Sequence, residues 1–248
     1  MKIAILGTRG IPNYYGGFEQ FAEYVSVGLL KKGHSVYVYC SNKHSYSENL
    51  WHNINLIHCY DPEYLIGTAG QFIYDLNCII DSRKRNFDVI LQLGYTSSSI
   101  WGKFLPKKSV IITNMDGLEW KRSKYSKLVQ KFLVYAEKLA IKTSHSLVAD
   151  SIGIQNYLKN KYKIDSVYIP YGTHKFNEPD ESILSKYKLR AFQFNMLIAR
   201  MEPENNIETI LQGISASSTK FPILVIGNNT NKFGRYLTNQ FSNDERII

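Results

Sequence analysis

Residues 3–17 read IAILGTRGIPNYYGG, and this stretch organises the rest of the chain. It opens with a short apolar run, residues 3–6, which is typical of a buried strand. Glycines then interrupt the run, and a helical pattern begins after Gly17. The order strand, glycine-bearing loop, helix predicts a loop at the carboxyl end of a strand, where parallel α/β sheets bind their ligands.

The four glycines of this loop, Gly7, Gly10, Gly16 and Gly17, let the backbone approach a ligand closely, and free N–H groups at a helix start favour anions. Their spacing does not fit the dinucleotide pattern G-x-G-x-x-G, and no G-K-[ST] follows as in a Walker loop. Arg9 adds a charge suited to phosphate. We therefore predict ligand binding by Arg9, Gly16 and Gly17, ahead of the alternative that a long turn simply needs several glycines.

Composition indicates a globular protein with an anionic partner or surface. The 248 residues are 44% hydrophobic and carry a net charge of +9. The three cysteines have no metal-like or C-x-x-C spacing, so we expect buried reduced thiols and a cytoplasmic protein. We find neither a signal peptide nor an apolar run long enough to cross a membrane.

Strand and helix patterns alternate through residues 1–172, which predicts a parallel sheet with helices on both faces. After the first strand and helix, we expect strands at 35–40, 54–58, 88–93, 109–114, 146–149 and 167–169. Expected helices lie at 65–83, 123–143 and 151–161, with a short helix or loop at 96–104.

The pattern changes at residue 173 and then restarts. Residues 173–190 are polar and indicate a linker with a short helix. Within residues 191–248 we expect strands at 195–199, 223–226 and 246–248 and helices at 206–216 and 232–241. Because two or three strands make an incomplete parallel sheet, we expect one complete domain, residues 1–172, and the beginning of a second, residues 191–248.

Four motifs together carry a resemblance to a known family. They are GTRGIP with GGFE (7–12 and 16–19), NMDGLEWKR (114–122), PYGT (170–173) and ARMEPENN (199–206). With them the whole chain resembles the retaining family 4 glycosyltransferases, and most closely the rhamnosyltransferase-like branch that builds bacterial polysaccharide.

The resemblance implies a GT-B architecture of two Rossmann-like domains, an acceptor-side domain followed by a donor-binding domain. It implies a nucleotide-sugar donor and a saccharide acceptor, often carried on a membrane lipid. It also implies that no cofactor and no bound metal are needed, and the six histidines show no metal-type clustering.

Arg200 is the candidate for stabilising a departing pyrophosphate, a task suited to cations and helix-start N–H groups. It follows an expected strand and precedes an expected helix. The alternative is a surface ion pair with Glu202 or Glu204. The family pattern usually has Lys where this chain has Asn205 and Gly where it has Asn206, so one cation is missing. We assign Asn205 to donor binding.

Asp116 follows another expected strand, between Asn114 and Gly117. In the family this region faces the acceptor and donor sugar, and a carboxylate there could orient or deprotonate the acceptor hydroxyl. The alternative is an Asx turn leading into Gly117. We assign Asn114 and Glu119 to substrate binding, although a solvated helix start would explain Glu119 as well.

The expected helix 123–143 carries two stripes at helical spacing. The apolar stripe, which we expect to pack on the sheet, comprises Leu128, Val129, Phe132, Leu133, Ala136, Leu139 and Ala140. The basic stripe comprises Lys124, Lys127, Lys131, Lys138 and Lys142. It is either a solvated face or a docking surface for anionic lipid at the inner face of the cell membrane, reinforced by Trp101, Trp120 and Tyr125.

The family's donor-binding domain also carries two glutamates separated by seven residues, and residues 200–248 contain no such pair. We therefore expect a truncated transferase. A non-catalytic module of the same fold that binds acceptor or membrane is a second hypothesis. A nucleic-acid-binding protein is a third, suggested only by the charge and supported by no binding motif.

Overall fold

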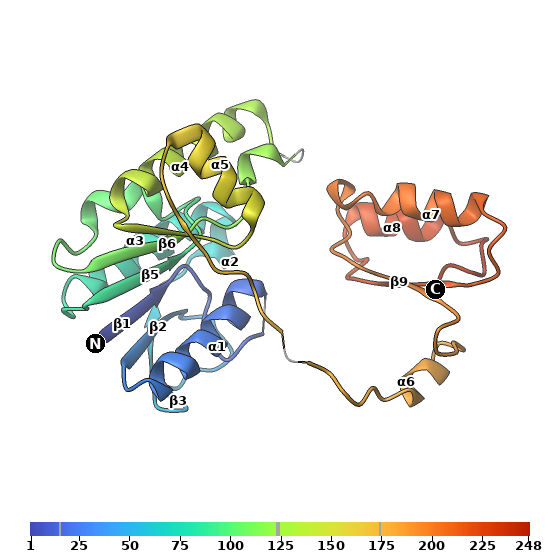
Figure 1. Cartoon of the computed structure of the whole chain (residues 1–248), viewed down its shortest axis with the longest axis horizontal. Helices are drawn as coiled ribbons and strands as arrows, with labels where there is room; N and C mark the ends of the chain where they lie inside the picture. The colour runs from blue at the N-terminus through green and yellow to red at the C-terminus, as the bar shows by residue number, and fades with distance from the viewer. Residues whose placement is uncertain (15, 123–124, 174) are drawn as a thin grey trace. The chain divides into compact units, whose positions relative to one another are not determined.

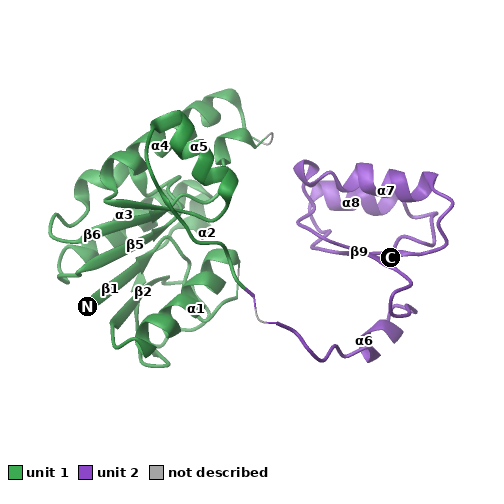
Figure 2. Ribbon diagram, in the orientation of Figure 1, with its two compact units in different colours: residues 1–172 green, residues 173–248 purple. Residues whose placement is uncertain are grey.

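β1 (Lys2–Leu6), the apolar run at the start of the chain, is an inner strand of an eight-stranded sheet (Figure 1). The structure is a computed structural model that describes residues 1–14, 16–122, 125–173 and 175–248. These residues form two compact units, Met1–Gly172 and Thr173–Ile248 (Figure 2).

The sheet of the first unit has the strand order β3-β4-β2-β1-β5-β6-β7-β8, and every pair except β3–β4 is parallel. This confirms the predicted parallel α/β fold. The other strands are β2 (Ser35–Ser41), β3 (Leu50–Trp51), β4 (Ile54–Cys59), β5 (Val89–Leu93), β6 (Val110–Asn114), β7 (Ser146–Ala149) and β8 (Val167–Tyr168).

β3 was not predicted, because two residues are too few to show an alternating pattern. It pairs with β4 through a tight turn at His52 and Asn53, whose φ angles of 46° and 65° are both left-handed. Such a turn joins neighbouring antiparallel strands without splaying them.

The helical elements of the first unit are α1 (Gly17–Lys31), α2 (Glu63–Ile66), α3 (Ala69–Ser82), η1 (Ser99–Phe104), η2 (Glu119–Lys121), α4 (Lys127–Thr143) and α5 (Ile152–Tyr162). The single helix expected at 65–83 is wrong. Gly67, at a φ of 63°, separates α2 from α3.

α4 begins later than predicted. The Ser126 side chain caps it by accepting the Val129 N–H, so the helix starts at Lys127 rather than at 123. Ser123 and Lys124, which the sequence placed in this helix, lie outside the described residues.

Both faces of the sheet are buried, which explains why its strands are apolar without alternation. Ala4 and Leu6 of β1 pack with Ile79 of α3 on one face. Ile5 packs with Ala22 of α1 on the other.

The second unit contains a small parallel sheet of β9 (Asn195–Ile198) and β10 (Ile223–Ile226), with residues 246–248 hydrogen-bonded alongside β10. α7 and α8, whose bounds follow, lie on one face of it (Figure 1). Its helical elements are α6 (Ser182–Ser185), η3 (Pro203–Asn205), α7 (Ile207–Ala216) and α8 (Lys232–Gln240).

Cys40, Cys59 and Cys78 are buried free thiols, as predicted. Among the helices of the described ranges, none combines the length and the apolar composition that crossing a membrane requires.

Candidate functional site

The loop after β1 is held tightly in place. Gly7 has a φ of 87°, and a Cβ atom there would lie 2.2 Å from the Leu93 carbonyl oxygen. Glu19, in the first turn of α1, is 4% exposed and folds back under the loop. Its carboxylate accepts the Arg9 N–H at 2.8 Å and the Thr8 hydroxyl at 3.1 Å. A buried charge with two donors fixes the loop before any ligand arrives.

Gly16 and Gly17 form the start of α1. Gly16 is the N-cap residue, and no described side chain caps the helix there. A Cβ on Gly17 would have no described heavy atom within 4 Å. Among the described residues no side chain accepts a hydrogen bond from the first N–H groups of the helix, and a helix start of this kind favours an anion or a hydroxyl oxygen.

Arg9 does not present an unmatched charge. Its guanidinium makes a bidentate pair with Glu63 of α2, with Arg9 Nε 3.0 Å from Glu63 Oε2 and a terminal nitrogen 2.7 Å from Glu63 Oε1. This pair could not be predicted from the sequence, because the two residues are 54 positions apart. Arg9 thus holds α2 beside the loop.

Asp75 of α3 is a buried carboxyl group near this pair. It accepts a hydrogen bond from the Ser97 hydroxyl at 2.5 Å. Burial raises its pKa to about 7, the Ser97 hydrogen bond and Arg9 act against that rise, and the Asp61 and Glu63 carboxylates add to it. Asp75 was not among the site residues predicted from the sequence. The available signal was an aspartate on the apolar stripe of its helix.

Asn114, the last residue of β6, shapes the turn that carries Asp116. Its side-chain oxygen accepts the Asp116 N–H at 3.2 Å, and its side-chain nitrogen donates to the Tyr171 hydroxyl at 3.4 Å. Asp116 has a left-handed φ of 43°, which aspartate tolerates better than most residues. The Asx turn at this position is therefore made by the Asn114 side chain rather than by Asp116, whose carboxyl group is half-buried beside it.

The Asp116 carboxyl group binds its proton more tightly than a solvated aspartate. Burial raises its pKa and the Asp150 carboxylate raises it further, while the Gly117 N–H and Arg122 act in the opposite direction. The pKa of Tyr171 rises to about 12, through burial and then through Asp116. A raised pKa makes a carboxylate a better proton acceptor.

Glu119 and its neighbours are anchored to the following helices. Glu119 pairs with Arg122 at 3.2 Å. The Trp120 indole N–H donates to the Tyr157 hydroxyl at 3.2 Å, and Tyr157 in turn donates to Glu137 at 2.8 Å. Glu137 is 1% exposed, so these two hydrogen bonds tie η2 to a buried carboxylate between α4 and α5.

The topology brings the predicted residues of the first unit to one edge. β1, β5 and β6 are adjacent and parallel, so their carboxyl ends meet at the same edge of the sheet. The end of β6 and the segments that follow β1 and β6 carry the candidate residues Arg9, Gly16, Gly17, Asn114, Asp116 and Glu119.

Arg200 and Asn205 belong to the second unit. Arg200 follows β9 and is exposed, and among the described residues no ion pair joins it to Glu202. The Asn205 side-chain nitrogen donates to the Arg200 carbonyl oxygen at 2.7 Å and so fixes the loop locally. Asn206 has a φ of 54°, which explains why glycine also suits that position.

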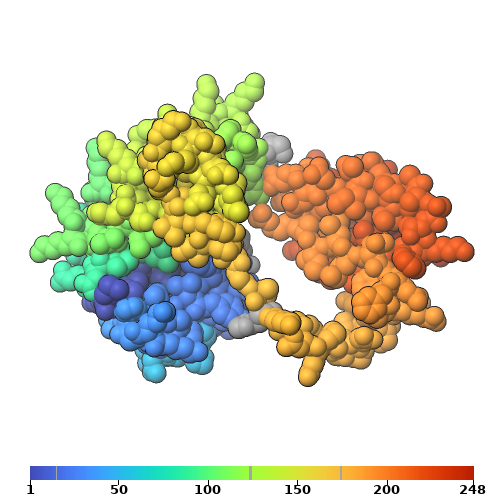
Figure 3. Space-filling model, viewed as in Figure 1, coloured from blue at the N-terminus to red at the C-terminus, as the bar shows by residue number. Residues whose placement is uncertain are grey.

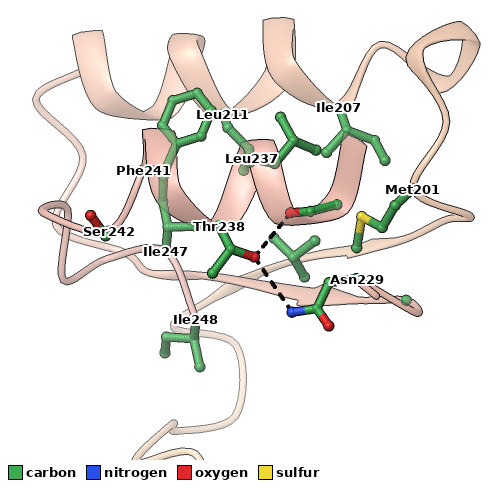
Figure 4. Close-up of a pocket in the computed structure, with 13 residues that line it drawn as sticks. Met201, Ile207, Leu211, Asn229, Leu237, Thr238, Phe241, Ser242, Ile247 and Ile248 are labelled. Atoms are coloured by element: carbon green, nitrogen blue, oxygen red, sulfur yellow. Dashed lines mark hydrogen bonds between the residues drawn. The ribbon is translucent and has the colours of Figure 1, made fainter. Parts of the chain in front are cut away.

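The second unit encloses a cavity of about 270 Å³ between its helices and its sheet (Figure 4). Its walls are mainly apolar, with Met201, Ile207 and Leu237 among them. The polar side chains of Asn229 and Thr238 also line it and hydrogen-bond to each other at 3.4 Å. None of the described residues that line it has a charged side chain, so it suits an uncharged ring better than a phosphate.

Within the described parts of the chain, no three histidine, cysteine or acidic side chains are grouped as a metal ion would need.

Solved structures share this fold. UDP-N-acetylglucosamine 2-epimerase from Rickettsia bellii matches with a TM-score of 0.59 and 16% identity over 100% of this chain and 67% of that one. The lipopolysaccharide outer core galactosyltransferase WaaB matches with a TM-score of 0.56 and 15% identity over 100% and 67%. Arabidopsis thaliana UGT89C1, complexed with UDP-L-rhamnose, matches with a TM-score of 0.51 and 12% identity over 90% and 64%.

The chain therefore has the Rossmann-like α/β fold of GT-B glycosyltransferases and of this epimerase. It spans about two thirds of the length of these three proteins. Comparison with curated proteins gave no match. The family model described as a domain of unknown function, DUF1972, matches residues 1–174, and the chain belongs to this family.

Proposed function

We propose that this protein is a glycosyltransferase that moves a sugar from a nucleotide diphosphate donor to a saccharide acceptor. One observation carries the proposal. The carboxyl edge of the first sheet combines an uncapped helix start at Gly16 and Gly17 with a half-buried carboxyl group at Asp116. The fold shared with nucleotide-sugar enzymes supports it.

In the proposed reaction the acceptor hydroxyl oxygen bonds to the anomeric carbon of the donor sugar. The bond from that carbon to the diphosphate oxygen breaks, and the nucleoside diphosphate leaves. Asp116 orients the acceptor hydroxyl and takes its proton. Asn114 and Glu119 bind sugar hydroxyls beside it, and the N–H groups at Gly16 and Gly17 receive ligand oxygens.

Arg200 is proposed to stabilise the departing diphosphate, because it is an exposed cation directly after a strand. Asn205 holds the backbone of that loop through its bond to the Arg200 carbonyl oxygen. The family 4 resemblance adds retention of configuration, rhamnose as the sugar, and a lipid-linked acceptor in cell-surface polysaccharide synthesis. It also implies that neither a cofactor nor a metal takes part.

The test is to incubate the protein with a panel of UDP-, GDP- and dTDP-sugars and membrane glycolipid extracts and to follow the nucleotides by NMR. Asp116→Asn and Arg200→Ala should each slow transfer by roughly 100-fold or more. Asp165→Asn and Arg190→Ala, at exposed positions elsewhere in each unit, are matched controls.

The same spectra separate the competing functions. An epimerised nucleotide sugar without transfer would indicate epimerase chemistry. Binding of a nucleotide sugar without any turnover would indicate a non-catalytic module. Equal activity of Asp116→Asn and the native protein would reduce Asp116 to a turn residue.

A further inference from the structure

The outer surface of α4 is strongly and uniformly basic. Lys127, Lys131, Lys138 and Lys142 fall within about 60° of one another around the helix, and all four are exposed. The only acidic residue of α4 is Glu137, which is buried. In the described part of the chain none of the four lysines joins an ion pair.

The element beside α4 extends this charge. η1 packs against the end of α4, where a Cβ atom on Gly102 would lie 2.5 Å from Thr143. η1 and the turn after it carry the exposed residues Lys103, Lys107 and Lys108 and no acidic residue. In the space-filling view, long side chains project from the green and yellow-green segments that include η1 and α4 (Figure 3).

Apolar side chains are exposed beside these lysines. Leu128 is 79% exposed and Tyr135 is 56% exposed, and helical spacing places both at the margin of the lysine stripe. Phe104 of η1 is 41% exposed. The prediction that Leu128 packs on the sheet is therefore wrong, because the first turn of α4 lies outside the core.

The tryptophans named from the sequence do not supply this apolar contact. Trp101 donates to the Phe72 carbonyl oxygen at 2.8 Å and packs against the core, and Trp120 is tied to Tyr157. The exposed apolar groups are instead leucine, tyrosine and phenylalanine.

We propose that this lysine face, formed by α4 and η1 with Leu128, Tyr135 and Phe104, docks on the surface of an anionic phospholipid bilayer. Charge alone would also attract nucleic acid. The apolar side chains favour the bilayer, because leucine and phenylalanine gain by entering its apolar boundary and tyrosine is favoured at its interface. The proposal is independent of the transfer reaction.

The experiment measures partition of the whole protein onto sedimented vesicles. One set contains phosphatidylglycerol in phosphatidylcholine, and the other contains phosphatidylcholine alone. The native protein should bind only the first set. The variant K127Q/K131Q/K138Q/K142Q should lose roughly two to three orders of magnitude in partition coefficient, at about fivefold per lysine.

The matched control K31Q/K32Q/R83Q/K84Q removes the same charge from exposed positions of other elements. It should bind within a few-fold of the native protein. L128Q/Y135Q should bind about tenfold more weakly at low and high salt alike, since its loss is not electrostatic. Unchanged urea midpoints will show that each variant is folded.

Three results would overturn the proposal. The first is no partition of the native protein onto the anionic vesicles. The second is an equal loss in both four-site variants, which would mean that net charge alone drives binding. The third is L128Q/Y135Q binding like the native protein while duplex DNA competes fully with the vesicles, which would assign the face to nucleic acid.

Discussion

Substituting Asp75 by asparagine should make the stability of this protein less dependent on pH and should raise its stability at alkaline pH. The native carboxyl group is buried and receives one hydroxyl hydrogen bond, and the Asp61 and Glu63 carboxylates raise its pKa while Arg9 lowers it. Its pKa in the folded state is about 7, against an ordinary value of 3.8. Ionisation of Asp75 therefore opposes folding.

The sign and size follow from linkage. Below pH 3.8 both states hold the proton and Asp75 has no effect, and above pH 7 the folded state carries the full cost of a buried charge. The interval between 3.8 and about 7 corresponds to about 4 kcal/mol. From pH 5 to pH 8 the free energy of unfolding of the native protein should therefore fall by about 3 kcal/mol relative to that of Asp75→Asn.

Asparagine keeps the size of the side chain and can still accept the Ser97 hydroxyl hydrogen bond. Urea unfolding of both proteins at half-unit steps from pH 5 to pH 8 measures the difference in free energy of unfolding. Asp165→Asn, at an exposed site, controls for loss of a carboxylate. A difference between Asp75→Asn and the native protein that stays constant across this range would refute the reasoning.

Three further substitutions test how the edge of the sheet is built. Gly7→Ala should lower the free energy of unfolding by roughly 2 kcal/mol or more, because its Cβ would meet a backbone oxygen at a left-handed φ. The control Gly28→Ala, in α1, should leave that free energy unchanged or raise it, and urea unfolding measures both variants. Glu19→Gln should lower the free energy of unfolding by about 1–2 kcal/mol and speed hydrogen exchange of the Arg9 amide. Unchanged exchange would contradict the role of the Glu19 carboxylate in holding the loop. Glu137→Gln should cost about 2 kcal/mol and shift Trp120 fluorescence, and an unaltered spectrum would mean that η2 is held by other contacts.

The fold could be predicted from the sequence because its signals are local. Apolar runs such as residues 3–6 and 88–93 are strands in the structure or overlap them within a residue, since parallel strands buried on both faces need no alternation. The secondary-structure predictions that were wrong also have local causes. A two-residue strand shows no pattern, and Gly67 breaks a helix that its apolar periodicity would continue.

The candidate site could be predicted only in part, because its electrostatics depend on long-range pairs. Placement of Asp116 after a strand followed from pattern alone. The partner of Arg9 is 54 residues away, and the carboxylate that anchors Trp120 reaches it through Tyr157 on another helix. Side chains so far apart in sequence leave no spacing signal, so charges that seemed available to ligands are matched within the fold.

These pairs change how the charges of the first unit can act. The candidate edge gathers several carboxyl groups, and its two arginines among the described residues, Arg9 and Arg122, are already matched by Glu63 and Glu119. A diphosphate placed there would have to break these two arginine pairs and would lie near the raised-pKa carboxyl group of Asp116. The hydroxyl groups of a saccharide are natural donors to carboxylates. We infer that this edge serves the sugar acceptor and that Arg200 of the second unit serves the diphosphate, so Arg9 acts by holding α2 against the glycine loop rather than by binding phosphate.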